Sequence, residues 1–165
     1  DFDIIGEHGR YTTEEHGVYL FKVERIHKQG NQQWAIINNS LMNYMPDLWG
    51  LHKDFIFLPV NNWDKEFKPY YLAGSTCDED DKVFIKSKNK QILLPQVEEI
   101  YVAVLGIGAY QEMISGDSSF SHCMIPKSNE LVITKDKEIF IKNNTLKEKF
   151  RRLSYTKTYL RNFDK

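Results

Sequence analysis

The sequence predicts a mainly β fold, an antiparallel Greek-key-like β-barrel or sandwich with a few short helices and a C-terminal α-helix. Short runs of alternating apolar and polar residues recur along the chain, and turn-forming residues separate them. Aromatic residues make up 13% of the chain, with nine Tyr and ten Phe, and this composition favours strands over helices. The length of 165 residues is that of a single domain.

The first part of the chain predicts a glycine turn and then a hairpin. Residues 2–5 are expected to form a short strand, and residues 6–10 the turn after it. Residues 18–28 alternate over a length that predicts a long strand, and residues 33–38 predict its returning partner. Between them, Gln29-Gly30-Asn31-Gln32 has the composition of a hairpin turn, in which the glycine supplies a positive φ.

The middle of the chain predicts short strands separated by irregular segments. Pro46 and Gly50 limit residues 41–51 to short helical turns, because neither residue favours a helix interior. Pro59 places the strand expected at 55–60 at a sheet edge or a bulge, since proline cannot donate to a central ladder. Further strands are expected at 70–74, 83–86, 91–94, 100–105, 132–134 and 138–142, with a short helix at 111–115.

Residues 145–165 predict an amphipathic α-helix. Thr145 and Glu148 have the spacing of a capping box. An apolar stripe follows at helical spacing, made of Leu146, Phe150, Leu153, Leu160 and Phe163. Residues 135–165 hold 10 Lys and Arg against 4 Asp and Glu, which we interpret as a solvated helix face, with contact to nucleic acid as the alternative.

Composition argues against several classes of partner. The net charge of −1 gives no electrostatic basis for binding nucleic acid or a membrane surface. Two cysteines, Cys77 and Cys123, are too few for a disulfide framework, and no secretion signal is present, so a cytoplasmic setting is expected. The chain opens without Met in what reads as a strand, and we therefore expect a piece of a longer protein.

The first candidate site is Glu7-His8-Gly9-Arg10-Tyr11. Gly9 lets a backbone N–H approach an anion closely, and the Arg10 guanidinium matches phosphate geometry. A carboxylate at Glu7 suits a cationic ring nitrogen. The alternative is an ordinary turn with surface charges.

The second candidate site runs from Gly74 to Asp81, with the sequence Gly-Ser-Thr-Cys-Asp-Glu-Asp-Asp. The acidic residues after Cys77 would raise the pKa of its thiol, which suits a proton donor better than a nucleophile. They would also attract a cationic ligand. The alternatives are a buried structural cysteine and a solvated acidic turn or weak cation site.

The third candidate site, Gly106-Ile107-Gly108-Ala109-Tyr110-Gln111, follows the most apolar expected strand. Its glycines can expose N–H groups to a phosphate, and the Tyr110 hydroxyl can add a hydrogen bond. No metal site is expected, because His16, His27, His52 and His122 lack metal-ligand spacing and Cys123 beside His122 makes only a pair.

These three segments occur in the same order in a known family. The chain resembles the C-terminal part of the fold-type III pyridoxal-phosphate-dependent decarboxylases, which include ornithine, diaminopimelate and biosynthetic arginine decarboxylases. The resemblance rests on Glu7-His8-Gly9-Arg10, where the family has Glu-Pro-Gly-Arg, on Gly74 to Asp78, and on Gly108-Ala109-Tyr110. It spans residues 2–126, and the longer acidic loop at 77–81 is most similar to the arginine decarboxylases.

The resemblance implies a role for each matching residue at the cofactor. Glu7 would pair with the pyridine nitrogen of pyridoxal phosphate and keep it protonated. Gly9, Arg10 and Tyr110 would hold the cofactor phosphate. His8, in place of the usual proline, would loosen the turn.

The resemblance also implies the chemistry of the acidic loop. Cys77 would deliver the proton after carbon dioxide leaves, and Asp78 would bind the distal cation of a basic amino-acid substrate. Asp80 or Asp81 would help to bind a guanidinium, which pairs well with two carboxylates. In this family these residues act on the cofactor of a neighbouring subunit, so a homo-oligomeric parent, at least a dimer, is implied.

The expected function is therefore part of a lyase that converts arginine to agmatine and carbon dioxide in polyamine and spermidine biosynthesis. The family's Schiff-base Lys precedes Glu7, so the isolated chain is expected to be inactive and not to bind the cofactor. Residues 1–14 would end the cofactor barrel, 15–144 would form the β domain, and 145–165 the helix. Two alternatives remain: a free-standing, non-catalytic β domain, or part of a diaminopimelate or carboxynorspermidine decarboxylase.

Overall fold

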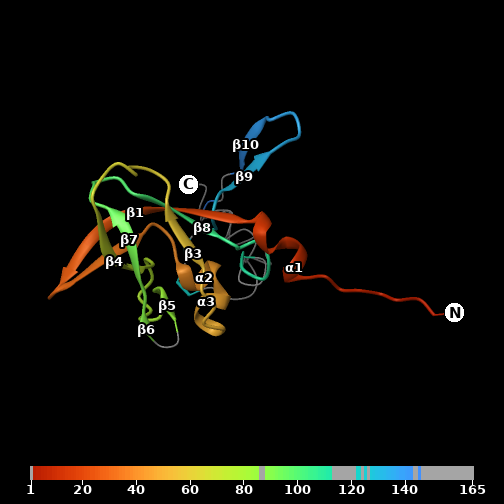
Figure 1. Cartoon of the computed structure of the whole chain (residues 1–165), viewed down its shortest axis with the longest axis horizontal. Coiled ribbons are helices and arrows are strands. Elements are labelled where there is room, and N and C mark those ends of the chain that lie inside the picture. The colour runs from red at the N-terminus through yellow and green to blue at the C-terminus, as the bar shows by residue number, and fades with distance from the viewer. Residues whose placement is uncertain are drawn as a thin grey trace, which may run out of the picture.

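A six-stranded sheet forms the body of the computed structural model (Figure 1), which describes residues 2–85, 88–112, 122, 123, 125, 127–142 and 145. The strands are β1 (Val18–Gln29), β2 (Gln32–Ile37), β3 (Ile56–Pro59), β4 (Phe67–Ala73), β7 (Gln91–Pro95) and β8 (Tyr101–Leu105). They lie in the order β3-β8-β1-β2-β4-β7. The two edge strands, β3 and β7, contact each other, so the sheet nearly closes into a barrel, as the sequence predicts.

The long strand β1 connects the two halves of this sheet. Its first part pairs with β8 and its second part with β2, both antiparallel. The register shifts between Val23 and Arg25, and such a β-bulge bends a strand and lets it belong to both halves. Gly30, with a φ of 56°, closes the predicted hairpin.

One ladder departs from the antiparallel pattern that the sequence predicts. β2 and β4 pair in parallel, with Trp34 opposite Tyr71. The chain between them passes through α2 (Leu41–Tyr44), α3 (Pro46–Gly50) and β3, a connection long enough to bring β4 alongside in the same direction. β3 is an edge strand, as the proline in it predicts.

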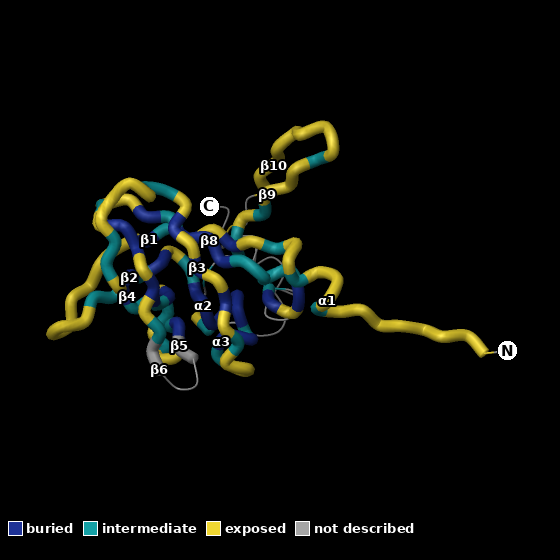
Figure 2. Tube along the Cα trace, in the orientation of Figure 1, coloured by how far each residue is buried: buried dark blue, intermediate teal, exposed yellow. Residues whose placement is uncertain are grey.

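The two short helices belong to the core. The Ser40 hydroxyl caps α2 by accepting a hydrogen bond from the Asn43 N–H at 3.0 Å, and Pro46 begins α3. The predicted short helical turns are therefore confirmed. Figure 2 shows that burial is concentrated in the sheet and in these helices, and the largest buried side chains include Phe21, Ile37, Leu41, Met45, Leu48, Leu72, Leu94 and Ile100.

The N-terminal segment does not form the expected strand. Residues 2–9 are exposed and lead away from the sheet (Figures 1 and 2), and none of the strands that the structure describes pairs with them. Because a strand is stable only beside a hydrogen-bonding partner, the prediction of a strand at 2–5 was wrong for this chain. The short helix α1 (Arg10–Thr13) and the 3-10 turn η1 (Glu14–His16) then lead into β1.

Two small hairpins complete the described structure. β5 (Phe84–Ile85) pairs with β6 (Lys88–Asn89), and β9 (Glu130–Ile133) pairs with β10 (Ile139–Lys142). Strands near β5, β9 and β10 were predicted from the sequence, whereas β6 was not. The expected helix at 145–165 lies outside the described residues except for its first residue, and most of the helix expected at 111–115 does too. Within the part of the chain that is described, no helix has the length and apolar character needed to cross a membrane.

Candidate functional site

The loop after β8 packs against the turns that precede β1. The Gly108 N–H donates a hydrogen bond to the Glu14 carbonyl at 2.9 Å. A Cβ atom at residue 108 would collide with the Thr13 carbonyl oxygen, so this close approach requires glycine. The contact brings together the first and third candidate segments, which lie far apart in the sequence.

Gly9, Arg10 and Tyr110 form one cluster, which we call the Arg10 cluster. The Tyr110 hydroxyl fills the space that a side chain at Gly9 would need. The Arg10 guanidinium carbon lies 5.2 Å from the centre of the Tyr110 ring. The three residues that the family resemblance assigns to a phosphate therefore lie next to one another in the structure.

A buried carboxylate orients the Arg10 guanidinium. Arg10 Nη2 lies 2.6 Å from Asp47 Oδ2, which also accepts a hydrogen bond from Gln111 Nε2 at 2.8 Å. Arg10 Nη1 is buried without a hydrogen-bond partner, and Glu14 Oε1 lies 3.7 Å from it. One guanidinium nitrogen is thus anchored, and the other keeps donor capacity toward an anion.

Lys53 adds a second positive charge beside this cluster. Its ammonium group forms an ion pair with Glu14. Burial, followed by the nearby Arg10 charge, lowers the pKa of Lys53. Both causes disfavour the charged form of the Lys53 amine. A bound anion would offset the repulsion between Lys53 and Arg10 and so favour that charged form.

Glu7 lies outside the Arg10 cluster. It is exposed on the segment that leads away from the sheet. The structure therefore brings together three of the four residues expected at the cofactor and leaves Glu7 in solvent.

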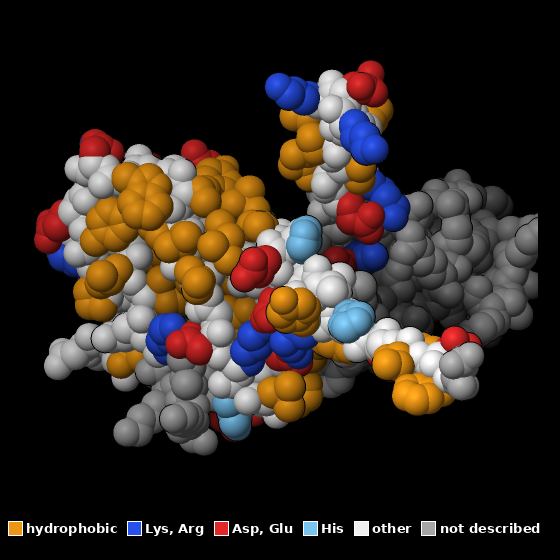
Figure 3. All heavy atoms as spheres, turned by 45° about the vertical axis from the view of Figure 1, so that its right-hand side comes forward, with side chains coloured by type: hydrophobic (Ala, Val, Ile, Leu, Met, Phe, Trp, Pro, Cys, Tyr) orange, Lys and Arg blue, Asp and Glu red, His pale blue; other side chains and the backbone are white. Residues whose placement is uncertain are grey.

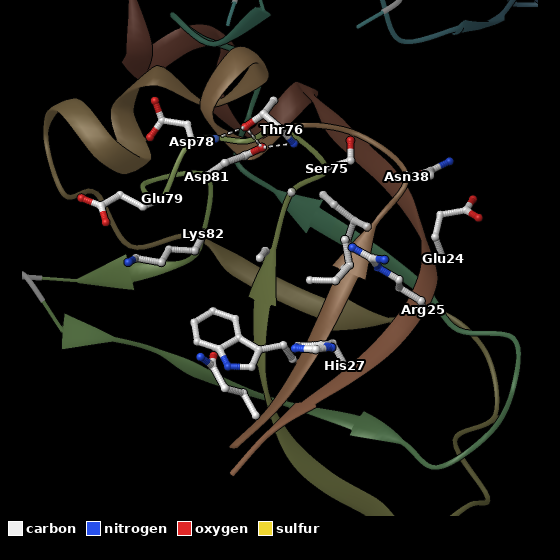
Figure 4. A pocket seen from close by; sticks show the side chains of 16 residues that line it. Glu24, Arg25, His27, Asn38, Ser75, Thr76, Asp78, Glu79, Asp81 and Lys82 are labelled. Atoms are coloured by element: carbon white, nitrogen blue, oxygen red, sulfur yellow. Dashed lines mark hydrogen bonds between the residues drawn. The ribbon is translucent and has the colours of Figure 1, made fainter. Parts of the chain in front are cut away.

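Asp81 shapes the loop that carries Cys77. Its buried carboxylate, 2% exposed, accepts hydrogen bonds from the Met42 N–H at 3.0 Å, the Thr76 N–H at 3.1 Å and the Thr76 hydroxyl at 2.7 Å. A side chain at Gly74 would collide with this carboxylate. Because both oxygens are engaged within the chain, as the dashed lines in Figure 4 show for Thr76, the geometry favours loop anchoring over substrate binding for Asp81.

Cys77 is exposed at the tip of this loop. Its Sγ lies 3.7 Å from Cys123 Sγ. The hydrogen bond with Cys123 is the largest cause that raises the pKa of Cys77, followed by the charge of Cys123, burial and the charge of Asp78. The thiol stays protonated to higher pH, as expected from the sequence, but the second cysteine contributes more than the acidic residues do.

Asp78 contacts the backbone of Asp80 in the turn that follows Cys77. Asp78 Oδ1 accepts a hydrogen bond from the Asp80 N–H at 2.9 Å, and Asp78 Oδ2 lies 3.5 Å from His122 Nε2. Asp78 also lines a groove of about 660 Å³ between the loop and the strands β1 and β2 (Figure 4). Glu24 and Glu79 add acidic side chains to this groove, while Arg25 and Lys82 add basic ones.

The helices α2 and α3 support both regions. Met42 in α2 binds Asp81, and Asp47 in α3 binds Arg10. Asn43 in α2 holds the backbone of His122, donating to its carbonyl at 2.7 Å and accepting from its N–H at 2.6 Å. The sequence motifs did not reveal these supporting residues, because their partners are distant in the chain.

Comparison with known proteins agrees with this architecture. The family model described as the C-terminal sheet domain of pyridoxal-dependent decarboxylases matches residues 10–108. The chain belongs to this family. The match includes Arg10 and the whole loop that carries Cys77, whereas Gly9 and Tyr110 lie just outside its two ends.

Curated relatives of this decarboxylase sheet domain are similar over part of their length. An arginine decarboxylase from Avena sativa is 35% identical over 116 residues, which cover 62% of this chain and 19% of the relative. A biosynthetic arginine decarboxylase from Bacteroides thetaiotaomicron is 32% identical over 102 residues, which cover 53% of this chain and 16% of the relative. The matched regions thus amount to about a fifth of these relatives.

Solved structures show the same fold. A diaminopimelate decarboxylase from Helicobacter pylori, complexed with L-lysine, superposes with a TM-score of 0.67 at 20% identity, covering 87% of this chain and 33% of that one. An arginine decarboxylase from Paramecium bursaria Chlorella virus, bound to agmatine, gives a TM-score of 0.55 at 20% identity, covering 66% and 29%. The barrel-like sheet is therefore the fold of the family's sheet domain.

Proposed function

We propose that the protein containing this decarboxylase sheet domain converts arginine to agmatine and carbon dioxide, and that this chain supplies part of its active site. The names of the curated relatives support arginine as the substrate. The observation that carries the proposal is the Arg10 cluster, in which Gly9, Arg10 and Tyr110 meet and one guanidinium nitrogen keeps an unused donor.

The residues present fit the phosphate of pyridoxal phosphate. The absence of a side chain at Gly9 lets the Tyr110 hydroxyl lie close to its backbone, and Arg10 Nη1 is a buried donor without a hydrogen-bond partner. Tyr110 adds a hydroxyl beside both groups. Glu7 would reach the ring nitrogen only if the exposed segment 2–9 docks against the rest of the protein.

When bound, this cofactor supplies an electron sink for the carbon that loses carbon dioxide. The family's Schiff-base Lys would come from outside the 165 residues. The isolated chain is therefore proposed to be inactive.

Cys77 is proposed to deliver the proton that replaces carbon dioxide. Its exposed position gives the thiol access to a substrate, and its raised pKa keeps the proton in place near neutral pH. Asp78 is proposed to bind the substrate guanidinium, with Asp80 as a second carboxylate two residues further along the loop, because a guanidinium takes paired carboxylates well. Asp81 is proposed to anchor the loop and not to bind the substrate.

An apolar face supports a larger assembly. Val18 and Leu20 of β1 and Ile56 and Leu58 of β3 are exposed on either side of β8. Figure 3 shows hydrophobic side chains gathered over the sheet, and such patches usually mark contact surfaces. We propose that the remainder of a homo-oligomeric parent, at least a dimer, covers this face, and that the parent serves polyamine and spermidine biosynthesis in the cytoplasm.

The substrate is tested by assaying the parent on arginine, ornithine, lysine and diaminopimelate with release of carbon dioxide as the readout. We expect arginine to be preferred and agmatine to be the product. A preference for diaminopimelate would favour the second candidate, which the structural likeness to diaminopimelate decarboxylases supports. The absence of decarboxylation on all four, and on carboxynorspermidine as a fifth substrate, would leave the non-catalytic domain as the better account.

A further inference from the structure

Cys77, His122 and Cys123 bring three metal-ligand groups to one place. One ligand atom from each residue lies within 4.8 Å of the other two. The two Sγ atoms are 3.7 Å apart, and His122 Nδ1 lies 3.1 Å from Cys123 Sγ. The sequence does not show this grouping, because 44 residues separate Cys77 from His122.

These separations are close to those of a tetrahedral metal site. Zn–S bonds of about 2.3 Å place two sulfur ligands about 3.8 Å apart, and a sulfur and a nitrogen ligand about 3.6 Å apart. The sulfur pair already has this spacing. The imidazole needs to move only a few tenths of an ångström away from Cys123.

Two neighbours hold the imidazole in a ligating orientation. Asp78 Oδ2 lies 3.5 Å from Nε2, so Nδ1 is the nitrogen that faces the sulfurs. A carboxylate on the distal nitrogen is the usual partner of a metal-bound histidine. The buried Asn43 side chain fastens the His122 backbone with two hydrogen bonds, and therefore fixes this segment beside the Cys77 loop.

We propose that Cys77, His122 and Cys123 form a binding site for Zn²⁺ or a similar thiol-preferring divalent cation. Two sulfurs and one imidazole select zinc-like metals over Mg²⁺ and Ca²⁺, which prefer oxygen ligands. Cys77 and Cys123 are exposed, so water can complete the coordination. Binding forms two metal–sulfur bonds and one metal–nitrogen bond and releases the two thiol protons to solvent.

The site has a consequence that rests on the proposed function. A metal bound to the Cys77 thiolate removes the proton that this residue is proposed to deliver. The cation would thus inhibit the parent without displacing its cofactor, and it would couple decarboxylation to the supply of thiol-binding metal.

Metal binding is tested on the full chain with Co²⁺ as a spectroscopic probe and Zn²⁺ as its competitor, in a reductant that does not bind metals. We expect one equivalent of Co²⁺ to produce a thiolate-to-metal charge-transfer band and tetrahedral visible bands, both removed by Zn²⁺. Cys123→Ala and His122→Ala should lose the stoichiometric site. The matched control His27→Ala, on β1, should retain it.

A variant that weakens the site without removing a ligand shows that a loss of metal binding does not come from a loss of folding. Asp78→Asn removes the partner of the imidazole but no ligand, and it should weaken Zn²⁺ binding roughly tenfold to a hundredfold. Circular dichroism of each variant checks that the sheet is intact. The same affinity in all variants, or the absence of a thiolate band in the unmodified chain, would overturn the site.

Inhibition is tested separately in the parent. We expect Zn²⁺ to inhibit turnover, with the Cys123→Ala parent at least tenfold less sensitive. If the chain binds the metal as described but the parent stays active with Zn²⁺ bound, the site stands and the proton-donor role of Cys77 fails.

Discussion

The Arg10 cluster and the Cys77 loop are held in place in different ways. In the Arg10 cluster, the functional side chain itself is anchored, because Arg10 pairs with the buried Asp47. In the Cys77 loop, the backbone is anchored through the buried Asp81, and the Cys77 thiol is left exposed. The first arrangement suits a group that must hold an anion still, and the second suits a thiol that must reach a substrate.

The largest effect is expected from breaking the loop anchor. Asp81→Asn replaces one of the two acceptor oxygens by an amide that faces an N–H or O–H donor. We expect the free energy of unfolding to fall by about 2–4 kcal/mol, measured by urea denaturation with tryptophan fluorescence. The exposed Asp80→Asn is the control and should change it by less than about 0.5 kcal/mol. If the two variants lowered the free energy of unfolding equally, Asp81 would not be an anchor of the loop.

The next effect concerns the Arg10 cluster. Gly9→Ala places a methyl group where the Tyr110 hydroxyl lies, so the cluster must open. We expect the parent to bind pyridoxal phosphate roughly tenfold to a hundredfold more weakly, equivalent to about 1.4–2.7 kcal/mol. Gly50→Ala is the matched control, because a side chain there meets no atom within 4 Å. If the Gly9→Ala parent bound the cofactor with unchanged affinity, the Arg10 cluster would not be part of the cofactor site.

A third variant sharpens the description of the Cys77 loop. Cys123→Ala leaves Cys77 as the chain's single thiol and removes the largest cause of its raised pKa. We expect the pKa of Cys77 to fall toward its ordinary value, measured from the pH dependence of alkylation by iodoacetamide. If the pKa of Cys77 stayed raised in this variant, the acidic residues of the loop, and not Cys123, would be the main cause.

The smallest effect lies in the β9–β10 hairpin, away from both regions. Hydrogen bonds from Lys142 and then Lys127 lower the pKa of Glu130. A lowered pKa stabilises the folded state above the ordinary glutamate value, and this contribution is lost as the pH falls through the lowered value. With 36% of the side chain exposed, we expect less than about 0.5 kcal/mol from this group. Hydrogen exchange of the hairpin amides should be faster in Glu130→Gln than in the unmodified chain at about pH 7, and the difference should shrink as the pH falls below the ordinary glutamate pKa.

Most of the fold could be predicted from the sequence, because short-range patterns determine its elements. The alternation in β1 and the glycine after it predicted the hairpin, and Pro46 and Gly50 predicted the short helices. The parallel pairing of β2 with β4 could not be predicted, since it depends on the path of a long connection. The strand expected at 2–5 failed because such a strand needs a partner that the described chain does not provide.

The candidate site could be predicted only in part. The motifs located Arg10 and Cys77, but their supports lie elsewhere in the sequence. The sequence offered no reason to select Asp47, and it showed His122 and Cys123 only as a pair of neighbours. The resemblance offered Asp81 as a partner for a substrate guanidinium, whereas its burial and its hydrogen bonds favour the role of an anchor. Such roles arise from tertiary contacts, which spacing along the chain does not encode.

We propose that the two regions divide the work, with Arg10 holding the cofactor and Cys77 delivering a proton. In the parent, cofactor affinity and turnover on arginine should be measured for Arg10→Gln and Cys77→Ala under the same conditions. We expect Arg10→Gln to weaken cofactor binding, and Cys77→Ala to lower turnover about 10²-fold to 10⁴-fold with cofactor affinity unchanged. A Cys77→Ala parent with normal turnover, or an Arg10→Gln parent with normal cofactor affinity, would contradict the account.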